Sequence, residues 1–209
     1  MTALLSEPAA ALLLVIDEMG GTTLTEAATA LGKSLSTVQR SAEGLLKSNA
    51  VHRSGPRGRL VMAPNAPRDA LRELAGWRLG PDRTNEIVTA ARYLRAGGRS
   101  LPSTIKEPEI RRSLPVALGR IVHQFRPDRV VLFGSQARGD SSRHSDVDLL
   151  VVFPDEGDRR ERQVAIRRLL ADMPFAKDVI VTSEERYKHP LPGTVTKSAV
   201  AEGVTLYER

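Results

Sequence analysis

The chain has 209 residues and a formal net charge of +6, and 41% of its residues are hydrophobic, 27% charged and 4% aromatic. This composition is ordinary for a globular protein, and the length gives room for two small domains. The sequence holds no cysteine, which excludes disulfides, thiolate metal sites and cysteine nucleophiles. The excess of basic residues is compatible with a polyanionic partner but does not identify one.

The longest apolar run, residues 9–16, is too short to cross a bilayer. Glu7 stands where a secretory signal peptide would carry basic residues. The sequence therefore predicts a cytoplasmic protein that has no membrane partner.

Residues 8–62 have the pattern of three helices followed by a β-hairpin. The first helix ends at Gly20-Gly21, a helix C-cap signal. Residues 23–26 form a predicted capping box for the second helix, and Ser34 is placed to cap a third helix that runs to about residue 48. The residues of this third helix that are expected to face inward are Leu35, Val38, Leu45 and Leu46. Two extended segments around the turn at 54–58 predict the hairpin.

This order resembles the winged helix-turn-helix domain of bacterial and archaeal transcriptional regulators, and residues 24–28, 31–34 and 36–40 carry the resemblance. It implies double-stranded DNA as a partner and a role in transcription regulation. Short polar side chains at the start of the third helix are expected to reach the major groove, and arginines of the hairpin to contact the DNA backbone or a minor groove. The predicted DNA-binding residues are Ser34, Ser36, Thr37, Gln39, Arg40, Arg53, Arg57 and Arg59.

The distribution of charge agrees with DNA binding. Residues 31–63 contain six basic side chains and one acidic side chain, whereas residues 1–30 contain only acids. A local basic surface of this kind is what docking to DNA requires. The alternative interpretation is a dimerisation or protein-binding module whose arginines are merely solvated. A homodimer is expected if the DNA target is palindromic.

Two further segments are rich in arginine. Residues 68–99 mix arginines with apolar residues, which predicts a pair of amphipathic helices that join the domains or form a dimer interface. Residues 158–172 predict another helix, whose arginines are interpreted as a solvated face, with acceptor or nucleic-acid binding as the alternative. The arginines of this second segment are Arg159, Arg160, Arg162, Arg167 and Arg168.

Two carboxylates follow a glycine–serine pair at a fixed spacing. A continuously apolar strand, residues 130–133, ends at Gly134-Ser135, and after ten more residues Asp146 and Asp148 open a second apolar strand. Side chains two apart in a strand point to the same side, so both carboxylates aim at one point. Their mutual repulsion there implies a hard divalent cation such as Mg²⁺. Asp178, at the start of a third strand, is placed to bring another carboxylate to the same site.

This pattern resembles the minimal nucleotidyltransferase branch of the DNA polymerase β superfamily, whose hallmark is Gly-Ser, ten residues and then Asp-x-Asp. Residues 134–139 also fit the Gly-Ser-x-Ala-Arg-Gly variant of that branch, and the similarity covers about 115–209. The resemblance implies an NTP substrate, whose phosphates are bound by Gly134, Ser135 and Arg138, although Arg138 is also placed to brace the loop. It implies two Mg²⁺ ions, with Asp146, Asp148 and Asp178 as catalytic carboxylates and metal ligands.

Together these features predict an α+β protein with a winged helix-turn-helix over 1–63, a helical connector over 64–112, and a small α/β nucleotidyltransferase domain with a mixed sheet over 113–209. We expect Mg²⁺-dependent transfer of a nucleoside monophosphate from an NTP to a hydroxyl of a protein or small molecule. Resemblance to antitoxins that work beside a helical toxin partner adds an autoregulatory role on DNA. The alternatives are a transcriptional regulator whose carboxyl-terminal domain only binds nucleotide or a partner, and, ranked last, an antibiotic-modifying transferase.

Overall fold

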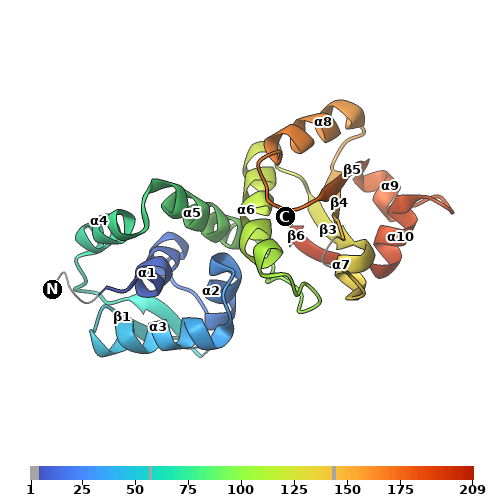
Figure 1. Ribbon diagram of the computed structural model, residues 1–209. Coiled ribbons are helices and arrows are strands. Elements are labelled where there is room, and N and C mark those ends of the chain that lie inside the picture. Colours follow the sequence, from blue (N-terminus) through green and yellow to red (C-terminus); the bar gives the residue numbers. More distant parts are fainter. Residues whose placement is uncertain (1–4, 57, 143–144) are drawn as a thin grey trace. The chain divides into compact units, whose positions relative to one another are not determined.

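The computed structural model describes residues 5–56, 58–142 and 145–209. The chain divides into two compact units, Met1–Arg95 and Ala96–Arg209 (Figure 1). Helices and strands are both present, and the second unit holds a mixed sheet, so the prediction of an α+β protein with a mixed sheet is confirmed. In the part of the chain that the structure describes, no helix is both long enough and apolar enough to cross a membrane.

The first unit builds three helices and a hairpin before two further helices. Its elements are α1 (Glu7–Met19), α2 (Leu24–Leu31), α3 (Leu35–Lys47), β1 (Val51–Ser54), β2 (Arg59–Met62), α4 (Arg68–Leu79) and α5 (Pro81–Arg95). The predicted capping box forms, because the Thr23 hydroxyl accepts a hydrogen bond from Glu26 N and the Glu26 carboxylate accepts one from Thr23 N. Ser34 caps α3 by accepting a hydrogen bond from Thr37 N at 3.3 Å.

Helix α1 is the centre of the first unit. Its residues from Leu12 to Ile16 are all buried, because α2, α3, α4, α5 and β2 pack around it. A helix that is apolar on all sides is stable only when other elements cover every side. The segment between α1 and α2 also joins the hairpin, since Thr22 and Leu60 exchange backbone hydrogen bonds of 2.9 and 2.7 Å.

The buried carboxylate of Glu18 fastens the later helices to α1. It accepts hydrogen bonds from Arg72 Nη2 on α4 at 3.3 Å and from Arg92 Nε on α5 at 2.9 Å, and Arg95 donates to the Glu18 backbone carbonyl. The segment that the sequence predicts as a connector, 64–112, therefore divides in the structure. Its helices α4 and α5 pack on α1, and the residues from Ala96 onward fall in the second unit.

The second unit is a four-stranded sheet with helices on both faces. Its elements are α6 (Pro108–Phe125), β3 (Arg129–Phe133), α7 (Gly134–Arg138), β4 (Val147–Phe153), α8 (Arg159–Leu169), β5 (Lys177–Ser183), α9 (Glu184–Lys188), α10 (Val195–Glu202) and β6 (Val204–Glu208). The strand order is β5-β4-β3-β6. Among the strands that the structure describes in this sheet, the β4–β5 pair alone is parallel, because α8 carries the chain back between these two strands.

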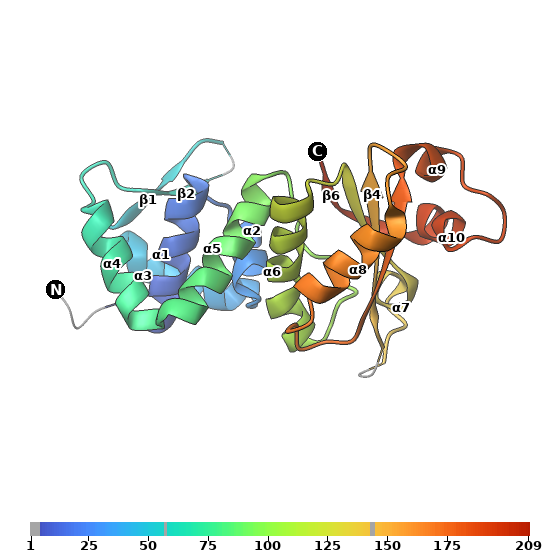
Figure 2. The same ribbon diagram turned by 90° about the horizontal axis from the view of Figure 1, so that it is seen from above.

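The two faces of the sheet pack against different helices. Figure 2 shows α6 and α8 on one side of the sheet and α9 and α10 on the other. Val131, Leu150 and Val152 form the apolar core with Ala199 of α10, and Tyr187 of α9 packs against it. The alternate residues of the strands face α6 and α8 and are also buried, so that register is fixed by apolar packing on both faces.

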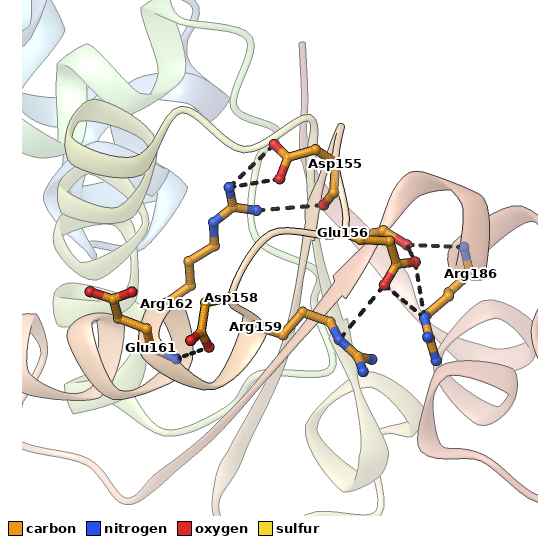
Figure 3. A network of polar contacts seen from close by, with 8 residues as sticks. Asp155, Glu156, Asp158, Arg159, Glu161, Arg162 and Arg186 are labelled. Carbon is orange, nitrogen blue, oxygen red and sulfur yellow. Dashed lines mark hydrogen bonds and ion pairs between the residues drawn. The ribbon is translucent and has the colours of Figure 1, made fainter.

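Charged side chains fix the loop that follows β4 (Figure 3). The Glu156 carboxylate accepts hydrogen bonds from the Ser183 hydroxyl and from Arg186 Nε at 3.0 Å. Arg162 of α8 donates to Asp155 at 2.9 Å and lies over the Phe153 ring. These contacts join the carboxyl-terminal ends of β4 and β5. Asp148 and Asp178 lie near the opposite, amino-terminal ends of the same strands.

We predict that Glu18→Gln lowers the free energy of unfolding of the first unit by about 1–3 kcal/mol at pH 7, the usual contribution of hydrogen bonds to a buried charge. Burial raises the pKa of Glu18, but hydrogen bonds from Arg92 and Arg72 outweigh burial and hold it below its ordinary value. A depressed pKa gives stability that is present above the unfolded pKa and is lost as pH falls through the folded one. Chemical denaturation of wild type and variant should therefore show a difference that shrinks below about pH 4.

The matched control for this measurement is Glu73→Gln, which removes an exposed carboxylate of α4. Its effect should stay within about 0.5 kcal/mol at either pH. A Glu18→Gln loss that is the same at pH 7 and at pH 3 would contradict the assignment of the effect to the ionised carboxylate.

Candidate active site

The sheet brings two of the predicted carboxylates into one row. Asp148 on β4 is the register partner of Asp178 on the parallel strand β5 and of Phe133 on β3. Register partners lie on the same face, so both carboxylates share the face that α9 and α10 cover farther along the strands. Asp146 lies just before β4, two residues ahead of Asp148, and is exposed whereas Asp148 is half-buried.

The charges of this row act on one another. Burial raises the pKa of Asp148 above its ordinary value, and the negative charges of Asp178 and Asp146 raise it further. The positive charge of Arg138 opposes this shift without cancelling it. The negative charge of an ionised Asp148 is therefore unfavourable, and a bound cation would stabilise it. This is the environment expected of a metal ligand or a reacting group.

Gly134 is required by the closeness of the Asp148 carboxylate. Its φ of +68° lies in the left-handed region, and a β-carbon at this position would collide with Asp148 Oδ2. The turn from β3 into α7 thus brings the main chain directly against the carboxylate. The residues of this turn that were predicted to bind phosphate, Gly134 and Ser135, are both half-buried.

Gln136 of α7 follows this turn, and the sequence pattern does not identify it as a site residue. It is fully buried, and its side-chain amide donates to the Ser145 carbonyl at 3.4 Å, which ties α7 to the segment leading into Asp146. Its Oε1 atom is buried and has no hydrogen-bond partner among the described residues. The position of Gln136, directly after a buried strand and the Gly-Ser turn, could have indicated from the sequence that its side chain is buried. A buried amide needs hydrogen-bond partners, so such a residue is expected to hold neighbouring segments together.

Arg138 braces the loop. Its Nε donates to Asp140 at 3.1 Å within the loop, and its Nη1 donates to Glu202 of α10 at 3.0 Å. These hydrogen bonds and charges raise the pKa of Arg138. The bracing role is thus visible in the contacts, while phosphate neutralisation stays a prediction.

Asp178 has a cationic partner of its own. Its carboxylate forms an ion pair with the guanidinium of Arg167 on α8. Within residues 5–56, 58–142 and 145–209, no group of three or more histidine, aspartate or glutamate side chains is arranged to hold a metal ion. The oxygen donors of Asp146 and Asp148 suit a hard cation such as Mg²⁺, and their repulsion calls for one, so the pair fits the metal on chemical grounds.

Comparison with known proteins supports a nucleotidyltransferase domain within the second unit. Residues 117–200 match the family model of the nucleotidyltransferase domain. The match runs from within α6 to within α10 and includes the Gly134 turn and the carboxylate row. The resemblance to nucleotidyltransferases is thereby confirmed for this region, and it indicates nucleotidyl transfer as the general reaction class and a transferase as the class of enzyme. A search of curated proteins found no match.

Nucleotidyltransferase domains typically use an NTP and a divalent metal, in agreement with the oxygen donors of the row. The match leaves the first unit uncovered. The identification of that unit as a winged helix-turn-helix therefore stays a prediction.

The residues predicted to bind DNA gather on α3 and the hairpin. The hydroxyl of Ser34 lies 3.1 Å from that of Ser36 and 2.9 Å from that of Thr37, at the exposed amino end of α3. Gln39 donates to Glu43 at 3.4 Å, and Arg40 is exposed.

Of the hairpin arginines, Arg53 is exposed and donates to the Gly58 carbonyl, whereas Arg59 pairs with Glu26 and donates to the Gly21 carbonyl. Arg57 lies outside the described residues. The ion pair of Arg59 with the capping box gives it a structural task within the first unit.

One expectation for α3 is wrong. Val38 and Leu45 are buried as predicted and Leu46 is half-buried, but Leu35 is 50% exposed. Leu35 is the first residue of the helix and follows the Ser34 cap, whose hydroxyl contacts those of Ser36 and Thr37. An apolar period within the helix predicts its interior positions better than its first turn.

We predict that Gly134→Ala destabilises the protein more than Gly193→Ala. The two glycines have similar positive φ values of +68° and +75°, so each substitution carries the left-handed backbone cost of about 1–2 kcal/mol. Nothing lies within 4 Å of a β-carbon at Gly193, whereas at Gly134 it collides with Asp148, which adds about 1–3 kcal/mol. Denaturant unfolding of the two variants beside wild type measures the difference, and equal losses would refute the close approach of the turn to the carboxylate.

Proposed function

We propose that the protein is a DNA-binding nucleotidyltransferase that uses Mg²⁺ to transfer a nucleoside monophosphate from an NTP to a hydroxyl group of a protein acceptor. The observation that carries the proposal is the row of mutually repelling carboxylates, Asp148 beside Asp178, against which the Gly134 turn is pressed. The match of residues 117–200 to the nucleotidyltransferase domain supports the reaction class.

Each part of the site has a task in this proposal. Asp146 and Asp148 would hold Mg²⁺, and the Gly134-Ser135 turn would bind the phosphates of the NTP. Bound Mg²⁺ supplies positive charge that offsets the charge of the phosphates. Asp178 orients the acceptor hydroxyl, whose oxygen forms a bond to the α-phosphorus while the bond to the bridging oxygen breaks and pyrophosphate leaves. The hydroxyl proton passes to solvent.

The proposal for DNA binding rests on the first unit. Helix α3 exposes the hydroxyls of Ser34 and Ser36 and the apolar side chain of Leu35 at its amino end, and it exposes Arg40 near its middle. Base edges in the major groove offer acceptors for such donors and a thymine methyl for an apolar contact. The order of α1, α2, α3 and the β1–β2 hairpin is the one that winged helix-turn-helix domains use.

In a toxin–antitoxin pair, this cytoplasmic protein would modify the toxin as its acceptor and repress the shared operon. Repression at a palindromic site would require a homodimer. If the first unit binds DNA as proposed, its fusion to a nucleotidyltransferase domain supports this regulatory role, since an enzyme acting only on a small molecule needs no contact with DNA.

A second candidate is a transcriptional regulator whose nucleotidyltransferase domain only binds nucleotide or a partner. One observation favours it: Asp178 is already ion-paired with Arg167, and the described residues hold no cluster of three carboxylates arranged for a metal. In this second case nucleotide binding would change the affinity for DNA without any transfer.

We expect label from α-labelled ATP, CTP, GTP or UTP to appear on one discrete acceptor when the full chain and Mg²⁺ are added to a lysate of the source cell. Asp146→Asn and Asp148→Asn should each reduce this transfer by about a hundredfold or more, because each removes a ligand for the charge that stabilises the reacting phosphates. Absence of transfer from all four nucleotides, together with a nucleotide-dependent change in DNA affinity, would favour the regulator.

The folded state of Asp148→Asn serves as the control for the transfer experiment. The raised pKa of Asp148 means that its contribution to stability is present below the unfolded pKa and is lost as pH rises through the folded one. At neutral pH the ionised side chain therefore opposes folding, and the asparagine variant should unfold at a higher temperature than wild type. A loss of transfer in this variant is then a loss of chemistry.

For the first unit, we predict that Arg40→Ala weakens binding to the DNA upstream of the protein's own gene by about 10–100-fold, the factor that corresponds to loss of one specific base contact. The matched control is Arg78→Ala, which removes an equal charge from an exposed position on α4. It should change the affinity by less than about twofold, since long-range charge is screened at physiological salt. Equal effects of both variants in a mobility-shift titration would indicate nonspecific attraction.

A further inference from the structure

The ion pair between Arg167 and Asp178 lies at the edge of the candidate active site. Asp178 is near the start of β5, an edge strand of the sheet, and α8 packs against this strand. Arg167 lies near the carboxyl-terminal end of α8, from which its guanidinium reaches Asp178. One carboxylate of the row is thus already bound to a cationic side chain of the protein itself.

This pair is built to exchange partners. The side chain of Arg167 is 50% exposed and that of Asp178 is 45% exposed, so both remain solvated and the pair contributes little to folding. Asp178 also lies beside Asp148 in the register of β4 and β5, where a bound cation would attract its charge. The Asp178 carboxylate can therefore leave Arg167 at small cost in free energy. Arg167 and a cation bound at Asp148 would compete for it.

We propose that Arg167 is a positioning residue that competes with the divalent cation for the carboxylate of Asp178. In the metal-free protein the guanidinium holds Asp178, and when the cation binds to Asp146 and Asp148, Asp178 turns to it and Arg167 is released. This inference rests on the proposed function, because it requires the cation site of that function. It explains why Asp178 is paired with Arg167 although its register places it beside Asp148.

Arg168 supplies a matched comparison. It follows Arg167 on α8, is exposed, and has no ion-pair partner among the described residues. Removal of any arginine near a cation site favours cation binding through general electrostatics. Competition for one carboxylate differs from that general effect, because it vanishes when the carboxylate itself is absent.

The test is a titration of the full chain with Mn²⁺, followed by the electron paramagnetic resonance signal of the free ion, without nucleotide. Arg167→Gln should tighten Mn²⁺ binding by up to about fivefold, the factor that corresponds to loss of an exposed ion pair, and Arg168→Gln by less than about twofold. Arg167→Lys keeps the charge and should restore affinity to within about twofold of wild type. In the Asp178→Asn background, Arg167→Gln should have no effect beyond that of Arg168→Gln.

The outcomes separate the two proposals. If wild type binds Mn²⁺ and Asp146→Asn/Asp148→Asn abolishes binding, but Arg167→Gln acts equally with and without Asp178, the competition is overturned and the metal site stands. If wild type does not bind Mn²⁺ at all, the metal site of the proposed function is overturned, and the role of Arg167 falls with it. Circular dichroism of each variant checks that the fold is retained.

Discussion

The parallel pairing of β4 with β5 is the constraint on which the second unit depends. It places Asp148 and Asp178 side by side, so that the sheet carries unfavourable repulsion at one end. The strands cannot slip to relieve it, because most of their remaining residues are buried and a shift by one residue would exchange the two faces. Apolar packing along the strands thus holds charged groups in an arrangement that they would not adopt by themselves, as is common at functional sites.

Neighbouring residues partly neutralise the charge of these carboxylates and position the turn beside them. Arg138 and Arg167 bring positive charge from α7 and α8, and both are held by carboxylates. The Gly134 turn removes the side chain that would otherwise press on Asp148. Gln136 ties that turn to the segment ahead of Asp146. The loop is therefore positioned by polar contacts, whereas the strands beneath it are positioned by apolar ones.

Local patterns predict most of the fold. The apolar runs give the strands, the Thr23–Glu26 pair gives its capping box, and the spacing from Gly134 to Asp148 gives the domain that the family match supports. Contacts between distant elements are not encoded locally. An amphipathic pattern shows that α4 and α5 have a buried face but not that α1 covers it. Likewise, Asp178 lies eleven positions after Arg167 and on a different element, so the sequence does not show that the two side chains pair.

Net charge does not show which surface binds a polyanion, because ion pairs with carboxylates neutralise many of the arginines. On α5, Arg83, Arg92 and Arg95 each lie against a carboxylate of the first unit. Arg40 on α3 has no carboxylate partner among the described residues, and the hydroxyls at the amino end of α3 lie on the same helix. A phosphate approaching the first unit gains more from an unneutralised guanidinium than from one that must first leave its carboxylate. The unpaired Arg40 of α3 is therefore a more favourable contact for a phosphate than Arg83, Arg92 or Arg95 of α5, in agreement with the proposal that α3 binds DNA.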